Sequence, residues 1–167
     1  MIRVGLGSDL HRLIPGRALI LGGVVLPFEK GEDGHSDGDV LFHAITDAVL
    51  GAAGLGDIGS FFPPEDPKWK DADSAELLKA VMQKVRSAGW ELVNIDCVIK
   101  LEKPKFLPYR QQVIESVAAA LGVSADKVFV KAKTGEKLPP VGTSDAVEAE
   151  AVCLLNLAAA KADQSLQ

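Results

Sequence analysis

His35-Ser-Asp-Gly-Asp-Val-Leu-Phe-His43 leads out of a polar loop into a stretch with helical periodicity, and the rest of the chain can be placed around it. Residues 38–54 carry apolar or small side chains at positions 40, 41, 44, 45, 48, 49, 52 and 53, the spacing of one face of an amphipathic helix. Ser36, Asp37 and Asp39 are residue types that cap a helix and complement its positive end. We therefore predict a helix over residues 38–54 that carries His43 on its first turns.

Residue types that bind metals strongly gather in the first 43 residues: Asp9, His11, His35 and His43, which include all three histidines of the chain. Asp9 and His11 are two residues apart, so on a strand both side chains point to one face. Two ligands from a strand and one from a helix suit a three-ligand zinc site with an open fourth position, the arrangement of catalytic zinc.

Simpler roles remain open for the same side chains. Asp9 could cap a turn, and Asp37 or Asp39 could do no more than cap the helix. If the metal site exists, Asp39 and Asp47, one turn either side of His43, are candidates to orient its imidazole.

Composition bounds the class of protein. With 167 residues, 47% of them apolar, residues 1–167 are predicted to form a single domain. The net charge is −5 and there is no block of Lys and Arg, which argues against a nucleic-acid partner. No apolar leader or membrane-spanning run is present, so we expect a soluble cytoplasmic protein. Cys97 and Cys153 lie in apolar runs and are expected to be buried thiols rather than a disulfide.

Periodicity and turn residues predict the other elements. Strands are expected at 2–7, 90–102, 128–134 and 145–157, and two short strands are expected within 18–27 around Gly22-Gly23. Helices are expected at 74–88 and 109–121. Loops or turns are expected at 28–36, 61–67 and 124–127. The last strand could also be read as a helix because it is rich in alanine. Glycines at 54, 56 and 59 around Asp57 indicate either backbone that a ligand approaches closely or a simple helix end.

Alternating strands and helices predict an α/β (α+β) fold, a sheet backed by helices on one face. The apolar strands leave the other face in need of cover, which an oligomer would supply.

In these motifs the chain resembles the 2-C-methyl-D-erythritol 2,4-cyclodiphosphate synthases of the non-mevalonate isoprenoid pathway. The resemblance extends to about residue 138 and rests first on the Asp-x-His at Asp9 and His11. Its longest part is the block HSDGDxxxHxxTDAxxGAxxLGDIG at 35–59. It continues through Phe62-Pro63, Asp66-Pro67, Pro104-Lys105, Lys131 and Glu136-Lys137-Leu138.

The resemblance implies a mixed four-stranded sheet with helices on one face, and a homotrimer in which three sheets pack around a three-fold axis with active sites between subunits. It implies conversion of 4-diphosphocytidyl-2-C-methyl-D-erythritol 2-phosphate into 2-C-methyl-D-erythritol 2,4-cyclodiphosphate with release of CMP, a metal-dependent lyase reaction. The 2-phosphate attacks the β-phosphorus of the same molecule.

The resemblance also implies roles for individual residues. Asp9, His11 and His43 would hold Zn²⁺, and Glu136 would help to hold Mg²⁺ or Mn²⁺ at the substrate diphosphate. His35 and Thr134 would act in catalysis by stabilising the transition state. The substrate, a cytidine diphosphate derivative, would contact Asp9, His11, His35, Ser36, Asp57, Ile58, Gly59, Phe62, Asp66, Leu101, Pro104, Lys105, Phe106, Leu107, Lys133, Thr134, Gly135 and Glu136. A neighbouring protomer would contribute the cytidine pocket at 101–107.

The chain departs from the family pattern in three places. Lys133 takes the place of the first residue of a Thr-Thr pair, and Gly135 follows Thr134. Pro140 and Thr143 stand where an aromatic residue and an arginine commonly line the central cavity of the trimer, so the sequence does not predict the isoprenoid diphosphate site proposed for that cavity. Pro64-Glu65 replaces a common Asp-Thr without touching a metal ligand.

Two other functions are compatible with parts of the sequence. A zinc hydrolase acting on a phosphoester would use the same open site and release a linear product. A trimeric binding protein with a structural metal is suggested only by the altered 139–145 segment. Structural zinc, however, is usually closed by four protein ligands.

Overall fold

The computed structural model describes residues 1–34, 36–63, 66, 68 and 72–158. Its main sheet has five strands in the order β4 (Lys30–Asp33), β1 (Ile2–Pro15), β7 (Ala146–Leu157), β5 (Trp90–Lys100) and β6 (Val128–Lys133). The pair β5–β6 is parallel and the other pairs are antiparallel, so the sheet is mixed. Four of the five strands are those expected from sequence, and β4 is an addition to the predicted four.

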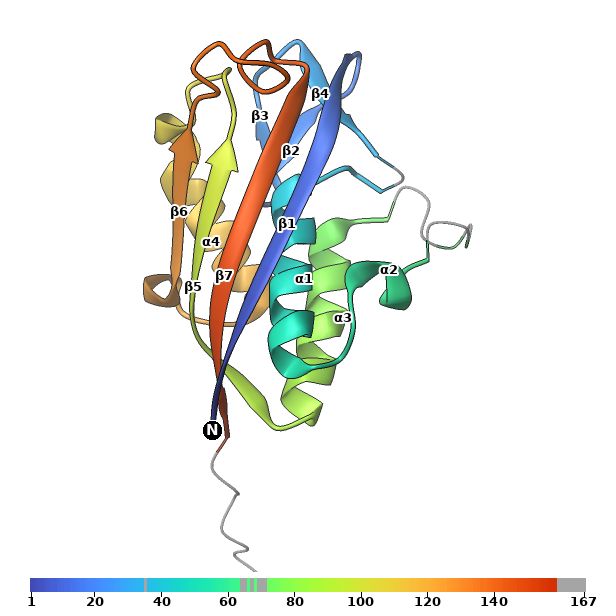
Figure 1. Ribbon diagram of the computed structural model, residues 1–167, viewed down its shortest axis with the longest axis vertical. Coiled ribbons are helices and arrows are strands. Elements are labelled where there is room, and N and C mark those ends of the chain that lie inside the picture. The colour runs from blue at the N-terminus through green and yellow to red at the C-terminus, as the bar shows by residue number, and fades with distance from the viewer. Residues whose placement is uncertain (35, 64–65, 67, 69–71, 159–167) are drawn as a thin grey trace, which may run out of the picture.

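Helices cover one face of this sheet (Figure 1). They are α1 (Val40–Ala53), α3 (Ser74–Ser87) and α4 (Arg110–Leu121), with short turns α2 (Ile58–Phe61), η2 (Leu107–Tyr109) and η3 (Ala125–Lys127). Strands β2 (Leu19–Leu21) and β3 (Val24–Leu26) form the predicted hairpin. The mixed sheet with helices on one face confirms the predicted fold class, and Cys97 and Cys153 are free and buried as expected.

Two predicted loops were wrong in part. Residues 28–36 contain β4, and residues 61–67 begin with the end of α2. The sequence around β4 predicts a loop because a charged residue such as Glu32 is usually exposed to solvent. In the structure Glu32 is fully buried. Its carboxylate accepts hydrogen bonds from the backbone N–H groups of Val40 at 3.0 Å and Ile20 at 3.3 Å, which satisfy its polar atoms. In addition, β1 runs on from the predicted end at residue 7 to Pro15, where it pairs with β4.

Helix α1 has the ends that its sequence predicts. The Asp39 side chain accepts from the N–H groups of Leu41 and Phe42, and Gly54 ends the helix with a φ of 71°. That left-handed conformation suits glycine at a helix C-terminus. The direction of α1, and with it the position of His43, is therefore set at both ends.

Two glycines of β1 let α1 lie directly on the sheet. A Cβ atom at Gly5 would lie 1.9 Å from the Ala48 carbonyl oxygen, and one at Gly7 would lie 2.0 Å from the Ala44 carbonyl oxygen. Contacts that short are impossible, so both positions require glycine while the helix stays in place. The close approach brings His43 over the strand that carries Asp9 and His11.

Replacing Gly7 with alanine is expected to destabilise the protein by about 1–3 kcal/mol or more, because the added methyl group overpacks the β1–α1 contact. Urea unfolding should report the loss as a lower transition midpoint with an unchanged slope. Gly51→Ala is the matched control, since a Cβ atom there meets nothing within 4 Å. Equal stability of Gly7→Ala and the parent protein would contradict the packing described here.

The face of the sheet opposite the helices is open. It carries exposed apolar side chains along β1 and ion pairs between β5 and its neighbours β6 and β7. Side chains at alternate positions of β1 are more than half exposed on it: Ile2, Val4, Leu6 and Leu10. Phe129 on β6 and Val152 on β7 are also exposed. Contiguous apolar surface of this kind marks an interaction site.

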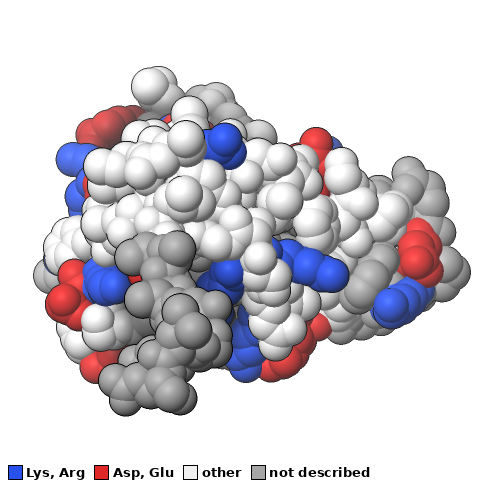
Figure 2. Space-filling model, turned by 90° about the horizontal axis from the view of Figure 1, so that it is seen from below, with Lys and Arg blue, Asp and Glu red and all other residues white. Residues whose placement is uncertain are grey.

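Charged side chains do not gather on the end of the molecule seen in Figure 2. Lys and Arg residues are interspersed there with Asp and Glu among uncharged residues, and the described part of that face carries no continuous basic patch. In the described part of the chain, none of the helices has the length and apolar character of a membrane span.

Candidate metal centre

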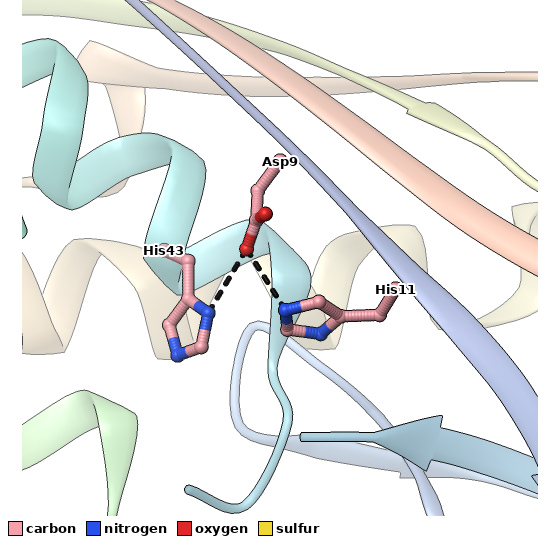
Figure 3. Close-up of side chains that lie close together, drawn as sticks. All are labelled: Asp9, His11 and His43. Atoms are coloured by element: carbon pink, nitrogen blue, oxygen red, sulfur yellow. Dashed lines mark hydrogen bonds and ion pairs between the residues drawn. The ribbon is translucent and has the colours of Figure 1, made fainter. Parts of the chain in front are cut away.

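Asp9, His11 and His43 converge where β1 passes the first turns of α1 (Figure 3). Asp9 Oδ2 lies 3.0 Å from His11 Nε2 and 3.0 Å from His43 Nδ1. The ligand atoms of the three residues all lie within 4.8 Å of one another. As predicted, the strand supplies two of these side chains on one face and the helix supplies the third.

The spacing and the outer contacts of these residues fit a zinc ion. Tetrahedral zinc with bonds of about 2.0–2.1 Å to nitrogen and oxygen holds its ligand atoms about 3.4 Å apart, close to the spacing seen here. His11 Nδ1 donates to the Gly38 carbonyl oxygen at 2.6 Å, which leaves Nε2 for the metal. His43 Nε2 lies 3.1 Å from both Ser36 Oγ and Ser74 Oγ, which leaves Nδ1. Metal-ligating histidines characteristically anchor their second nitrogen in this way.

The electrostatics of the cluster also favour a bound cation. Burial would raise the pKa of Asp9, but hydrogen bonds from His11 and His43 outweigh it and hold that pKa well below its ordinary value. Burial would lower the pKa of His11, yet the hydrogen bond and negative charge of Asp9 raise it. Asp9 is therefore ionised and can bind a cation. Without a metal, the negative charge of Asp9 favours a proton on the neighbouring histidine instead.

Binding of zinc to the metal-free protein should weaken as the pH falls. Zinc must displace the proton on His11 Nε2, and the raised pKa of His11 keeps that proton in place above the ordinary value of 6.5. Below the raised pKa, affinity should fall by about tenfold per pH unit for each proton displaced. The proton stabilises the metal-free fold fully below pH 6.5 and ceases to do so as the pH rises through the folded-state pKa.

Competition titrations with a chromophoric chelator at several pH values would measure this dependence. An affinity that stays constant between about pH 5.5 and pH 8 would contradict the assignment of His11 as a ligand, because an ordinary histidine already titrates within that range.

Asp39 and Asp47 do not orient His43, so that prediction was wrong. Asp39 is fully buried, and besides capping α1 it accepts from the N–H groups of Gly22 and Gly23 at 2.9 and 2.6 Å. Burial raises the pKa of Asp39 to about 6. Asp47 accepts from the Ile58 N–H at 2.7 Å, and burial raises its pKa. Both carboxylates therefore hold loops against α1.

Sequence reasoning missed Ser74, which contacts His43 from the first position of α3. Thirty-one positions separate the two residues, and no local spacing relates them. Ser36, which was predicted to bind substrate, lies beside the centre and also accepts from the Gly38 N–H at 3.2 Å. His35 lies outside the described residues.

A second group of predicted residues gathers where the parallel strands β5 and β6 end. The Leu101 N–H donates to the Lys133 carbonyl at 2.9 Å, and the Gly135 N–H donates to Glu102 Oε2 at 3.1 Å. The Thr134 hydroxyl donates to Glu136 Oε1 at 2.8 Å. The side chains of Thr134 and Glu136 are exposed, and Glu136 has a φ of 51°.

The segment 101–107 begins at the same end of the sheet, and two of its apolar side chains are buried. Leu101 and Phe106 are buried in the core, whereas Lys105 and Leu107 are exposed and Pro104 is half-buried after a cis peptide bond. A ligand here could therefore reach Leu101 and Phe106 only through backbone groups.

Sheet register separates the two groups within one chain. Leu10 lies opposite Glu148, Glu148 opposite Lys100, and Lys100 beside Lys133. Three strand spacings of about 4.8 Å place the ends of this row about 14 Å apart. On the helix-covered face, fully buried side chains fill the interval: Ile99, Val147 and Ala149. One chain therefore brings together each half of the predicted site but does not join the halves.

The segment predicted to meet the erythritol part lies beside α1. Asp57 caps α2 by accepting from the Ser60 N–H at 2.8 Å, and Asp47 on α1, one turn after His43, holds the Ile58 N–H. Gly59 lies within α2, which places residues 57–59 next to the metal centre. Phe62 packs against the core and Asp66 is exposed, whereas Pro64, Glu65 and Pro67 lie outside the described residues.

A separate cavity of about 520 Å³ is lined by Leu10, Arg12, Leu13, Pro140, Asp145 and Ala146. Thr143 donates to Asp145 Oδ2 at 2.6 Å beside it. Pro140, one of the departures noted in the sequence, therefore lines this cavity, and Thr143 contacts one of its lining residues.

Known proteins match this chain over nearly its whole length. The model of the YgbB family matches residues 2–156. The 2-C-methyl-D-erythritol 2,4-cyclodiphosphate synthases of Treponema denticola and Moorella thermoacetica are 56% and 51% identical over 154 residues; the matches cover 92% of this chain in both cases and 96% and 94% of the relatives.

Solved structures agree. A CDP-bound form of 2C-methyl-D-erythritol-2,4-cyclodiphosphate synthase superposes with a TM-score of 0.85 at 40% identity, covering 92% of this chain and all of the other. The bifunctional IspDF of Campylobacter jejuni superposes with a TM-score of 0.90 at 41% identity, over 94% of this chain and 42% of that one. The chain belongs to the YgbB family of 2-C-methyl-D-erythritol 2,4-cyclodiphosphate synthases.

Proposed function

We propose that this protein is a lyase that converts 4-diphosphocytidyl-2-C-methyl-D-erythritol 2-phosphate into 2-C-methyl-D-erythritol 2,4-cyclodiphosphate and CMP, a step of the non-mevalonate pathway. The observation that carries the proposal is the convergence of Asp9, His11 and His43 in a chain of this family. Three protein ligands leave a fourth position for substrate, as in catalytic zinc sites.

The reaction is an intramolecular phosphoryl transfer. An oxygen of the 2-phosphate forms a bond to the β-phosphorus, and the bond from that phosphorus to the bridging oxygen breaks. The electron pair of the broken bond leaves on the α-phosphate of CMP. Because the nucleophile is already an anion, the site needs positioning and charge neutralisation rather than a strong general base.

Asp9 Oδ2, His11 Nε2 and His43 Nδ1 would hold Zn²⁺, an ion that catalytic sites bind with one carboxylate and two imidazoles. When bound, zinc supplies Lewis-acid stabilisation of charge that develops on a phosphate oxygen. The hydroxyl of Ser36, beside His43, would bind phosphate, and His35 would act with it on the transition state.

The second half of the site would bind the nucleotide end. Glu136 would help to hold Mg²⁺ or Mn²⁺ at the substrate diphosphate, since hard cations prefer carboxylate oxygens. The Thr134 hydroxyl, hydrogen bonded to Glu136, would stabilise the transition state, and exposed Lys133 would add positive charge nearby. The acidic chain can bind an anionic substrate because cations reverse the local sign.

Other residues would recognise the uncharged parts of the substrate. The erythritol part would contact Asp57, Ile58, Gly59, Phe62 and Asp66, of which residues 57–59 lie beside α1. The cytidine would contact Leu101, Pro104, Lys105, Phe106 and Leu107, with Gly135 next to the phosphates. Buried Leu101 and Phe106 support recognition of the base through backbone groups rather than through apolar side chains.

A homotrimer would join the two halves. Within one chain they are about 14 Å apart across a filled sheet. The open face of the sheet carries exposed Ile2, Val4, Leu6 and Leu10, which a neighbouring chain would cover. Closed three-fold packing would place the 134–136 segment of one protomer near the metal centre of the next. Sedimentation velocity should return the mass of three chains, and a monomer at working concentration would contradict this.

Phosphorus NMR of the reaction with zinc and Mg²⁺ present would test the function. The expected result is a pair of coupled diphosphate resonances from a cyclic product, with CMP released in equal amount. A linear product would indicate the phosphoester hydrolase instead. Unchanged substrate in a folded, zinc-loaded sample would overturn the proposed activity.

A further inference from the structure

A chain of hydrogen bonds lies behind His43. Ser74 Oγ, 3.1 Å from His43 Nε2, also lies 2.5 Å from Asp37 Oδ1. The Ser74 N–H donates to Asp37 Oδ2 at 3.1 Å, and the Asp39 N–H donates to Asp37 Oδ1 at 3.2 Å. Ser74 is 1% exposed, so water does not substitute for these partners. The chain links the first turn of α3 to a side chain of the metal centre.

The two histidines of the centre differ in how their outer nitrogen is held. His11 Nδ1 meets the carbonyl oxygen of Gly38, which can only accept, so His11 must carry a proton there. His43 Nε2 meets hydroxyl groups, which can donate or accept. A hydroxyl that donated its proton to Nε2 would favour a proton on Nδ1, the nitrogen that has to bind the metal. Another partner of the hydroxyl therefore has to fix the direction of its hydrogen bond with His43 Nε2.

Asp37 sets that direction. Both of its carboxylate oxygens face backbone N–H groups, which can only donate, so both oxygens act as acceptors. The single proton of the Ser74 hydroxyl therefore goes to Asp37 Oδ1. The lone pairs of Ser74 Oγ are left to accept the proton on His43 Nε2, which frees Nδ1 for the metal.

Ser36 cannot take over this task. Its Oγ also lies 3.1 Å from His43 Nε2, but the partners described for it are Nε2, the Gly38 N–H and Ser74 Oγ, none of them a carboxylate. Nothing among those partners prevents the Ser36 hydroxyl from turning its proton toward Nε2 or toward a bound phosphate.

We propose that Ser74 and Asp37 are positioning residues of the metal centre, which hold His43 as the Nε2–H tautomer that ligates through Nδ1. This inference rests on the metal site of the proposed function. Residues that anchor a ligating histidine in this way typically contribute about 10–100-fold to metal affinity. Neither residue touches the metal or the substrate in this assignment.

Ser74→Ala tests the proposal. Helix α3 should survive the change, because Asp73 caps it by accepting from the Ala75 N–H at 2.8 Å. Chelator competition should show zinc binding weakened by about 10–100-fold. In the zinc-loaded protein, NMR of ¹⁵N-labelled histidine should show that the His43 Nε2 proton exchanges with water faster than in the parent. Asp37→Asn should weaken zinc binding in the same direction, because an amide cannot accept from every donor that faces it.

Thr46→Val is the matched control, since it removes another buried hydroxyl of the same region, one that donates only to the Phe42 carbonyl at 2.7 Å. It should leave zinc affinity and the Nε2 proton unchanged. Parent-like zinc affinity in folded Ser74→Ala would overturn the proposal. If that variant fails to fold, rapid exchange of the Nε2 proton in the zinc-loaded parent would overturn it equally. A parent protein that binds no zinc would instead overturn the metal site itself.

Discussion

His43→Ala is expected to lose bound zinc and at least about a thousandfold in turnover while keeping its fold. The imidazole supplies one of three protein ligands, and Lewis-acid stabilisation is worth several kcal/mol, with 1.36 kcal/mol corresponding to each factor of ten in rate. The fold should persist because the buried contacts of α1 come from other residues, among them Leu41, Phe42 and Ile45. Metal analysis of the purified variant, sedimentation and phosphorus NMR would measure the three properties.

The control for this experiment is Thr46→Val, which changes a neighbouring buried side chain of α1 without touching the centre. It should keep zinc and turnover. Turnover by zinc-depleted His43→Ala at the rate of the parent would show that the metal centre is assigned to the wrong residues.

Glu136→Gln is expected to raise the Mg²⁺ or Mn²⁺ concentration needed for half-maximal activity by about tenfold or more, while zinc stays bound. The change removes the negative charge but keeps an oxygen that can accept from Thr134 Oγ1, so the local geometry is retained. Tenfold corresponds to about 1.4 kcal/mol, a modest loss for a carboxylate facing a divalent cation. Activity titrations with Mg²⁺ and Mn²⁺, together with zinc analysis, provide the two readouts.

Glu76→Gln makes the same change of charge on the surface of α3, where the carboxylate pairs with Lys79 at 2.6 Å. The metal requirement should not change in that variant. Loss of zinc from Glu136→Gln would mean that the roles of the two metal sites have been exchanged, because Glu136 lies at the other end of the row of strands from Asp9.

Much of the metal centre could be predicted because its signals are local. The two-residue spacing of Asp9 and His11 places them on one face of any strand, and the periodicity of 38–54 places His43 on a helix. The glycine and aspartate at the two ends of α1 are where helix capping predicts them. These features depend on backbone geometry over a few residues and hold in almost any tertiary context.

The partners of His43 could not be predicted in the same way. Asp39 and Asp47 are near it along the helix, but Asp39 faces the Gly22-Gly23 turn and Asp47 faces Ile58. Ser74 is far away in sequence and reaches His43 only because α3 packs beside α1. Strand β4 could not be predicted for a similar reason. Its glutamate is typical of the surface, and the backbone N–H groups that allow it to be buried come from other segments.

Short-range periodicity predicted α1, α3, α4 and the strands other than β4 in their correct order, and the long block at 35–59 indicated the family and, through it, the triad. Which groups face one another depends on how distant segments pack in the folded chain. This packing brought Ser74 and Asp37 behind His43, and it separated the triad from Thr134 and Glu136 by the width of three strand spacings. The physical reason is that hydrogen-bond partners and sheet neighbours are chosen by packing between distant segments, which spacing along the chain does not encode.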